Sequence, residues 1–242
     1  MAGGSSNPDK KQILDIRFLK EKYDLKIDGI IHIGAHLAHE HIMYLNTGVR
    51  DIIYFEPVKE IHDTLVKNIS YIHNNFVSTD LSTHIFNFAL GNENKDDVVM
   101  NVEKNDRYGC SSILEPSTNY NHIPFVQEKV KMRRLDDIKE LKDLALSPTL
   151  KYNYLNLDVQ GYELEVLKGA SNSLESIDYI MCEINRDTTS KKLDYIGASL
   201  IDEVCNFLSK YNFELVEERW PGTSWGDGFF IKRVKNESIW AS

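Results

Sequence analysis

Two short segments near the start of the chain pair a glycine with an acid at a spacing that has chemical meaning. Gly34 follows the apolar run Gly29 to Ile33, and Glu56 follows the next apolar run, Asp51 to Phe55. In nucleoside-binding α/β folds, a glycine after the first strand lets the backbone approach the ligand, and an acid about 20 residues later accepts hydrogen bonds from the ribose. Because an ionised carboxylate can accept from two donors, we expect Glu56 to hold both ribose hydroxyls.

The residues after Gly34 narrow the choice of nucleoside. The further glycines of a dinucleotide-binding loop are replaced by His36 and His39, which leave less room for a pyrophosphate. This favours S-adenosylmethionine (SAM), which has no pyrophosphate, over NAD. Gly34 by itself also fits a tight turn that binds nothing. We expect SAM to contact the following residues: Gly34, Ala35, His36, Glu40, Glu56 and Pro57.

Two acids occur at the ends of later apolar runs, and we expect both to be catalytic. Asp158 follows the run Tyr152 to Leu157, and Glu183 lies among apolar neighbours in Tyr179 to Ile184. A carboxylate beside a hydroxyl can orient it and accept its proton; alternatively, Asp158 caps the helix that begins near Gly161. Glu183 could bind substrate hydroxyls, hold Mg²⁺ together with Asp158, or only form structural hydrogen bonds. Nothing in the sequence requires a metal.

Four closely spaced histidines, at positions 32, 36, 39 and 41, do not predict a metal site. His32 falls in the first predicted strand and His36 in the turn after it. The other two fall in the next helix, where residues two apart do not share a face. We expect these rings to be hydrogen-bonded or to face solvent.

The elements that must position these residues alternate between short apolar runs and longer amphipathic segments. We predict strands at Gly29 to Ile33, Asp51 to Phe55, Ile85 to Leu90, Tyr152 to Leu157, Tyr179 to Ile184, Phe213 to Glu218 and Phe229 to Val234. We predict helices at 10 to 23, Ala38 to Leu45, Val58 to Ile69, Tyr162 to Leu167 and Ser199 to Ser209. The basic segment Lys129 to Arg134 alternates with apolar residues, as in a strand with one solvated face.

This alternation predicts an α/β fold, a Rossmann-like doubly wound sheet of about seven strands that are mostly parallel. The last two strands are joined by too short a link for a helix, so we expect a C-terminal antiparallel hairpin. By analogy of fold, such a sheet is typical of class I SAM-dependent methyltransferases rather than of nicotinamide dehydrogenases. We expect residues 10 to 242 to form one domain with an N-terminal helical extension, and residues 1 to 9 to be a flexible tail.

Composition restricts the kinds of partner. The 242 residues are 42% hydrophobic and 27% charged, which suits a globular domain. A net charge of −9 disfavours nucleic acid, because binding phosphates requires clustered Lys and Arg. No apolar stretch approaches roughly 20 residues, so we expect no membrane insertion. The three cysteines are odd in number and lack C-x-x-C spacing, which indicates reduced thiols and a cytoplasmic protein.

Several motifs occur along the chain in an order that matches a known family. They are HIGAH, YFEP, FALGN, GCSSIL, RRLDDI, LNLDVQGYELEVLKGA, MCEIN and GDGFFIK, and they run from Ile30 to Lys232. In this order they resemble the FkbM family of SAM-dependent O-methyltransferases, and the long segment around Asp158 is the most specific of them. The chain departs from the family at four positions, where many members have aspartate in place of His32, asparagine in place of His36, glycine in place of Ala38 and glutamate in place of Gln160.

The resemblance implies roles for further residues. It implies that Asp158 lies beside the methyl donor and the acceptor, and that Ser111 and Ser112 approach the amino-acid end of SAM. In this fold adenine is usually contacted at the position of Ala89 and Leu90. Near the end of the chain, the segment Trp220 to Asp227 contains two tryptophans. Because indole rings stack on sugar rings, we expect a sugar or glycan acceptor, although two tryptophans that cover a core are equally common. We expect the acceptor to contact Gln160, Glu163, Trp225 and Asp227.

Three other functions share some of these features. A nicotinamide-dependent oxidoreductase has the same use for Gly34 and Glu56 and would bind NAD. A nucleic-acid methyltransferase uses the same cofactor but needs a basic surface. A non-catalytic relative would bind SAM or a glycan without forming S-adenosylhomocysteine (SAH).

Overall fold

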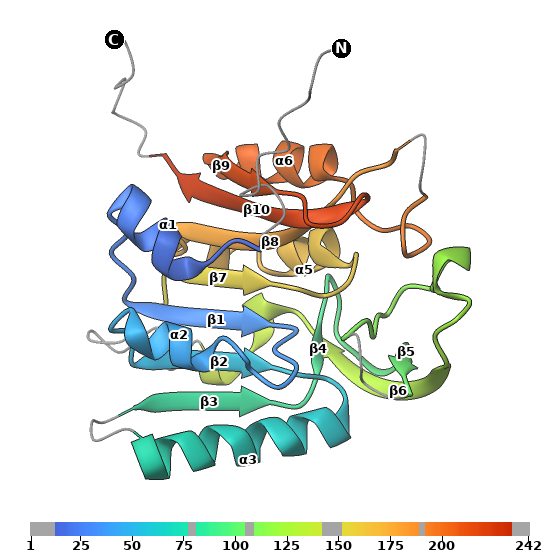
Figure 1. The fold of residues 1–242 in the computed structure, drawn as a ribbon, viewed down its shortest axis with the longest axis horizontal. Coiled ribbons are helices and arrows are strands. Elements are labelled where there is room, and N and C mark those ends of the chain that lie inside the picture. Colours follow the sequence, from blue (N-terminus) through green and yellow to red (C-terminus); the bar gives the residue numbers. More distant parts are fainter. Residues whose placement is uncertain (1–12, 77–80, 105–108, 142–151, 189–191, 234–242) are drawn as a thin grey trace, which may run out of the picture.

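The computed structural model describes residues 13–76, 81–104, 109–141, 152–188 and 192–233. The predicted tail of residues 1 to 9 lies outside these ranges, as do the first residues of the predicted N-terminal helix and Val234. The chain forms a seven-stranded sheet between layers of helices, with a three-stranded sheet beside it (Figure 1). Among the described helices, none is long and apolar enough to cross a membrane.

The main sheet has the predicted doubly wound arrangement. In sheet order its strands are β3 (Ser82–Phe86), β2 (Asp51–Phe55), β1 (Gly29–Ile33), β7 (Tyr154–Leu157), β8 (Tyr179–Asn185), β10 (Trp225–Lys232) and β9 (Phe213–Arg219). Strand β10 runs antiparallel to both β8 and β9, and the other neighbours are parallel. The predicted fold class, including the terminal hairpin, is confirmed.

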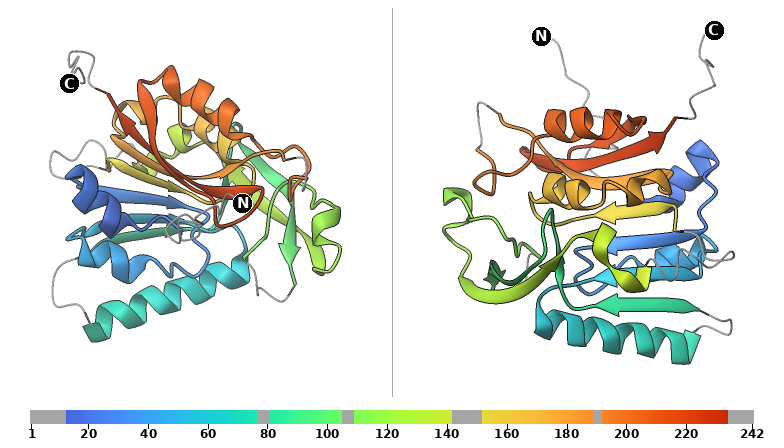
Figure 2. Two further views of the ribbon diagram at one scale, coloured as in Figure 1. Left: turned by 45° about the horizontal axis from the view of Figure 1, so that its top comes forward. Right: turned by 180° about the vertical axis from the view of Figure 1, so that it is seen from behind.

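Helices cover both faces of this sheet, because its central strands are apolar on both sides (Figure 2). On one face Ile30 belongs to a core with residues around α1 (Ile16–Tyr23), α2 (His41–Asn46) and α3 (Lys59–Phe76). On the other face Ile31 belongs to a core with α5 (Glu163–Gly169) and α6 (Ile201–Ser209). Neighbouring residues of one strand thus serve opposite cores, as the pleat requires.

The helices form where the sequence places apolar residues at helical spacing. In α3 the buried residues Ile61, Leu65 and Ile69 are four apart and face the sheet. Helix α1 begins later than predicted, after Asp15, whose side chain accepts a hydrogen bond from the Arg17 N–H at 2.8 Å.

The predicted strand Ile85 to Leu90 is wrong as a single element. It divides into β3 in the main sheet and β4 (Ala89–Leu90) in the smaller sheet, whose order is β4, β6 (Phe125–Arg133), β5 (Lys95–Glu103). Between the two parts, the Asn87 amide donates to the carbonyls of Glu56 and Pro57, both at 3.0 Å. These bonds turn the chain away from β2 and carry Ala89 to the edge of the smaller sheet.

Candidate active site

A cavity of about 580 Å³ lies at the carboxyl ends of β1, β2, β7 and β8. The order of the sheet reverses between β1 and β7, and open α/β sheets bind ligands at that point. Most of the residues predicted to form the site line this cavity: Gly34, Ala35, His36, Glu40, Glu56, Pro57, Ala89, Leu90, Ser111, Asp158, Gln160, Glu183 and Trp225. Ser112, Glu163 and Asp227 lie behind its wall.

The loop after β1 makes a tight turn against the loop after β7. The N–H groups of Gly34 and Ala35 both donate to the carbonyl of Phe55 at 3.0 Å. Gly34 has a φ of 79°, and a Cβ added there would lie 1.7 Å from the carbonyl oxygen of Asp158. Glycine is therefore required both by the backbone conformation and by the close approach.

Replacing Gly34 with alanine is expected to lower the free energy of unfolding by about 2 kcal/mol, from positive-φ strain plus the displacement of Asp158. The matched control is Gly48→Ala. Gly48 also has a positive φ, 95°, but nothing lies within 4 Å of an added Cβ, so we expect a loss of only about 1 kcal/mol. Urea unfolding measures both values, and equal losses would contradict the close approach at Gly34.

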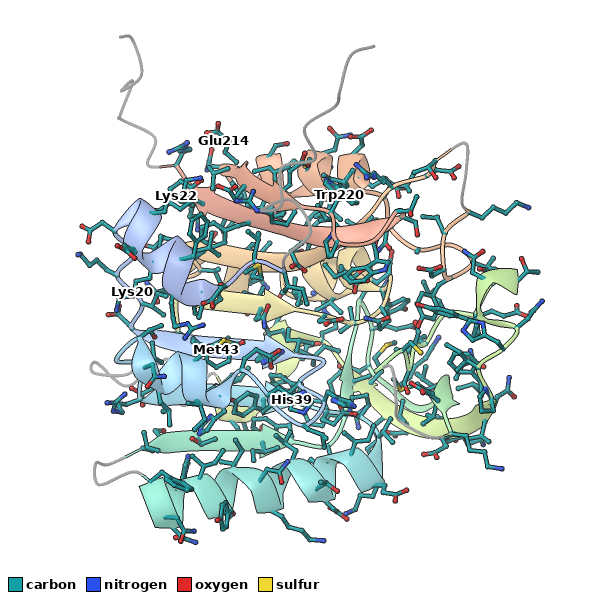
Figure 3. All side chains as sticks on the ribbon, viewed as in Figure 1. Lys20, Lys22, His39, Met43, Glu214 and Trp220 are labelled. Atoms are coloured by element: carbon teal, nitrogen blue, oxygen red, sulfur yellow. The ribbon has the colours of Figure 1, made fainter. Side chains whose placement is uncertain are left out.

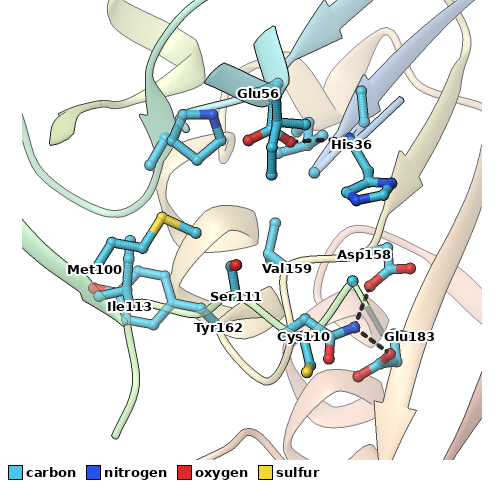
Figure 4. Close-up of a pocket in the computed structure, with 18 of the residues that line it drawn as sticks. His36, Glu56, Met100, Cys110, Ser111, Ile113, Asp158, Val159, Tyr162 and Glu183 are labelled. Carbon is cyan, nitrogen blue, oxygen red and sulfur yellow. Dashed lines mark hydrogen bonds between the residues drawn. The ribbon is translucent and has the colours of Figure 1, made fainter. Parts of the chain in front are cut away.

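The Glu56 carboxylate stands between the loops that follow β1 and β2 (Figure 4). It is 5% exposed, and its two oxygens accept hydrogen bonds from the backbone N–H groups of His36 at 2.9 Å and Val58 at 2.8 Å. Each carboxylate oxygen can accept a second donor. Its two backbone donors thus hold the carboxylate at the cavity wall.

An apolar wall lies beside Glu56. It is formed by Ala89 and Leu90, together with Ile61, Met100 and Ile113. Ala89 and Met100 also belong to the core cluster that joins α3 to the smaller sheet, so this wall has a packed support. The cavity thus has an apolar surface next to a buried acid.

The two predicted serines lie in different places. Ser111 lines the cavity, and its hydroxyl accepts the Glu103 N–H at 3.0 Å. Ser112 is buried and joins two loops, since its hydroxyl donates to the Gln160 carbonyl at 2.8 Å and accepts the Leu114 N–H at 3.0 Å. Its position indicates support of the Gln160 loop.

Two acids and one amide form the floor of the cavity (Figure 4). The Gln160 side-chain nitrogen donates to Asp158 Oδ1 at 2.7 Å and to Glu183 Oε2 at 3.0 Å. Gln160 has a φ of 55°, which turns its side chain back across the end of β7. One neutral amide therefore holds two carboxyl groups together.

The protein surrounding this floor changes the acidity of both carboxyl groups. The Asp158 carboxyl faces the cavity, yet the protein around it displaces water and raises its pKa, while the Gln160 hydrogen bond opposes the rise. Burial, followed by repulsion from Asp158, raises the pKa of Glu183 well above its usual range. Asp158 therefore ionises at a lower pH than Glu183, which holds its proton to higher pH.

Glu163 and Asp227 support the cavity from behind its wall. The Glu163 side chain accepts the N–H groups of Val159 at 3.2 Å and Gly161 at 3.0 Å, and burial raises its pKa to about 7. Asp227 accepts the Leu14 N–H at 2.9 Å, and burial raises its pKa to about 6. The backbone thus binds one oxygen of each carboxyl group, while Glu163 Oε2 has no hydrogen-bond partner among the described residues.

The alternative interpretation of Asp158 as a helix cap is wrong. Helix α5 has Tyr162 at its N-cap position, without a side-chain capping bond.

The histidines of the first loop are dispersed. His39 lies on the loop between β1 and α2 (Figure 3), while His41 is buried and bonds to the Tyr54 hydroxyl at 2.8 Å and to His73 at 3.2 Å. Burial lowers the pKa of His41 to about 4. Within the described ranges, no three His, Cys, Asp or Glu side chains are grouped so as to hold a metal ion.

Several residues of the outer wall were not predicted, among them Tyr120, His122, Asn185 and Tyr195. Tyr195 donates to the Cys110 carbonyl and lies 3.3 Å from Gln160 Oε1. Most of these residues come from irregular segments, where no periodicity marks them. Asn185 had a signal, since it lies two residues after Glu183 on the same strand.

Replacing Gln160 with glutamate is expected to destabilise the protein in a pH-dependent way, because it puts a third carboxyl beside two whose pKa is already raised. Groups with a raised folded-state pKa stabilise the fold when protonated, and that contribution is lost as pH rises. We expect a wild-type-like free energy of unfolding at pH 4.5 and a loss of about 2 kcal/mol at pH 8. Urea unfolding at both pH values checks this, with the exposed Gln127→Glu as control; equal losses at both would contradict it.

Comparison with known proteins relates this geometry to chemistry. Residues 32–215 match the family described as "Methyltransferase FkbM domain". The hexuronic acid methyltransferase AglP of Haloferax volcanii is 44% identical over 93 residues, which make up 35% of this chain and 38% of that protein. The chain therefore matches well under half the length of this relative.

Solved structures show the same fold. The methyltransferase FkbM from Methylobacillus flagellatus KT aligns with a TM-score of 0.51 and 15% identity, covering 85% of this chain and 43% of that one. The magnesium protoporphyrin IX methyltransferase (ChlM) from Synechocystis PCC 6803, solved with bound SAH, aligns with a TM-score of 0.51 and 8% identity, covering 90% and 80%. At these identities the likeness concerns the fold alone.

Proposed function

The chain belongs to the FkbM methyltransferase family, and from this we propose that it transfers the methyl group of SAM to a hydroxyl oxygen of a sugar or glycan. The observation that carries the proposal is the position of Glu56, a buried acid fixed by two backbone donors at the edge of a strand-end cavity. That position suits a carboxylate that accepts both ribose hydroxyls.

The other walls of the cavity fit the remaining parts of SAM. Ala89 and Leu90 offer an apolar surface for adenine, and Gly34 leaves the backbone of the first loop open to the ligand. Ser111 and the acids of the floor lie where the amino-acid end and the sulfonium would be. The solved methyltransferase ChlM, which shares the fold, contains SAH, and this supports the choice of cofactor.

Asp158 is the proposed catalytic base. When bound, SAM would supply a methyl group activated by a positively charged sulfur, and SAH, whose sulfur is neutral, would be the leaving group. The Asp158 carboxylate accepts the proton that the acceptor hydroxyl loses, and Gln160 keeps this carboxylate aimed into the cavity. Holding the hydroxyl in line with the methyl group supplies most of the rate enhancement.

A sugar is proposed as the acceptor on two grounds. The relative AglP carries the name of a hexuronic acid methyltransferase, although it is matched over only part of its length. The cavity also combines an indole, from Trp225, with the carboxyl groups of its floor, from Asp158 and Glu183. Aromatic faces and hydrogen-bonding acids together suit a ring that bears hydroxyl groups.

A turnover assay tests this function. The purified protein is incubated with SAM and a panel of glycans, with and without EDTA, and SAH is measured. We expect SAH with at least one glycan, unchanged by EDTA, and none with RNA or DNA. Formation of SAH with nucleic acid alone, or stabilisation by NAD but not by SAM in a thermal-shift comparison, would replace this function with another.

A further inference from the structure

A patch of four side chains extends from the floor of the cavity across β8 and β10. The antiparallel register places Glu183 opposite Asp227 and Asn185 opposite Trp225. Residues two apart on a strand share a face, and so do directly opposite residues of neighbouring strands. Asn185 and Trp225 are therefore neighbours on the face that carries Glu183, one step further from Asp158 than Glu183 is.

The Asn185 amide is a buried polar group without a complete set of partners. Its side chain is 3% exposed and borders the cavity, and its Nδ2 has no hydrogen-bond partner in the part of the chain that the structure describes. An unpaired buried N–H is costlier than an unpaired buried carbonyl. Because a half-turn of an amide interchanges its two ends, the Asn185 side chain can offer its NH₂ group to an oxygen of a ligand in the cavity.

The Trp225 indole is fixed beside this amide. A Cβ added at Gly222 would lie 2.4 Å from the indole Nε1, so the ring lies directly on the backbone of the turn between β9 and β10. Trp220, which is labelled in Figure 3, stacks instead on the Arg186 guanidinium, 4.0 Å from the ring centre, and is not part of the cavity lining. Of the two tryptophans in the described ranges, Trp225 is thus the one that can present a surface to the acceptor.

The charge of the cavity limits which ring can enter. The acids Glu40, Glu56, Asp158, Glu183 and Asp194 line it. A carboxylate or phosphate on the acceptor would therefore be repelled by these acids.

We propose that Asn185 and Trp225 form the subsite for an uncharged sugar ring, with the indole stacked on the ring and the amide donating to a hydroxyl next to the one that is methylated. This subsite rests on the proposed function and names its substrate class. It differs in one respect from what the name of the relative AglP suggests, because a hexuronic acid carries a carboxylate.

The test uses matched sugar probes on the full-length protein saturated with SAH. The probes are the methyl glycosides of glucose, galactose and mannose, each paired with its uronic acid, at pH 8. Saturation-transfer NMR measures their binding. We expect at least one neutral glycoside to bind, its uronate to bind at least about tenfold more weakly, and Asn185→Ala to weaken the neutral probe about tenfold.

Two further variants keep the test decisive. Gly222→Ala forces the indole to move, and we expect it to weaken the same probe while SAH affinity, measured by calorimetry, stays unchanged. Asn206→Ala, on the exposed side of α6, is the control and should bind like wild type. Equal binding of the uronate, or wild-type binding by both Asn185→Ala and Gly222→Ala, would overturn the subsite alone; an absence of SAH binding would overturn the proposed function and the subsite with it.

Discussion

Replacing Glu56 with alanine is expected to weaken SAM binding about 100-fold, because two charge-assisted hydrogen bonds to the ribose are lost. The alanine variant also loses the acceptor that holds the backbone N–H groups of His36 and Val58. Glu56→Gln separates the two effects, since it keeps one acceptor oxygen and the shape of the side chain. We expect it to weaken SAM binding about tenfold. Isothermal titration calorimetry measures both affinities.

The control for this prediction is Glu60→Ala. Glu60 is exposed on the first turn of α3, four residues from Glu56, and its loss changes the net charge by the same amount. We expect its SAM affinity to match wild type. If Glu56→Ala and Glu56→Gln also bound SAM like wild type, the ribose would have to be held elsewhere.

The second large effect is expected for Asp158→Asn, which should lower kcat about 1,000-fold while leaving SAM affinity within about threefold of wild type. Asparagine keeps the shape of the side chain but cannot accept the proton of the acceptor hydroxyl. The asparagine side chain also keeps an oxygen that can accept the hydrogen bond from the Gln160 amide, so the floor of the cavity should remain intact. SAH formation under saturating acceptor measures kcat, and Asp97→Asn on exposed β5 is the control.

The pH dependence of turnover identifies the base independently. Asp158 must be ionised to accept a proton, and its raised pKa means that the ionised form is lost at a higher pH than for an ordinary aspartate. Turnover should therefore rise with pH through this raised pKa and then level off. The residual turnover of Asp158→Asn should lack that rise. A rise that persisted unchanged in the variant would assign the titration to another group, such as Glu183.

The first two strands and their loops could be predicted from sequence because local residues determine them. The run Gly29–Ile33 is apolar apart from His32 and is followed by a glycine. The run Asp51–Phe55 is apolar apart from its first residue and is followed by Glu56. These features depend on residues within a few positions of each other, so their strand ends, and the placement of Gly34 and Glu56 in one cavity, follow from the parallel topology.

The smaller sheet was only partly predicted, for two physical reasons. Strand β5 begins with the charged residues Lys95, Asp96 and Asp97 and carries an irregularity in its pairing with β6, so it lacks a clean alternation. The division of the third strand depends on hydrogen bonds from Asn87 to residues about 30 positions earlier. Neither signal is visible in a short window of sequence.

The supporting role of some predicted ligands could not be read from residue type. Asp227 and Leu14 are 213 positions apart, yet the Leu14 N–H occupies the Asp227 carboxyl. Glu163 has the composition of a site acid but turns inward to bind the loop that precedes its own helix. Burial of a charged side chain indicates that it has partners, but only the folded chain determines whether those partners are backbone groups or ligands.

A crystal structure of the protein with SAH is the most direct test of the central claim, that a nucleoside occupies the cavity at the ends of β1 and β2. The account predicts that both ribose hydroxyls donate to Glu56, that adenine lies against Ala89 and Leu90, and that the sulfur faces Asp158. Electron density for SAH outside this cavity, or a ribose without contact to Glu56, would contradict it.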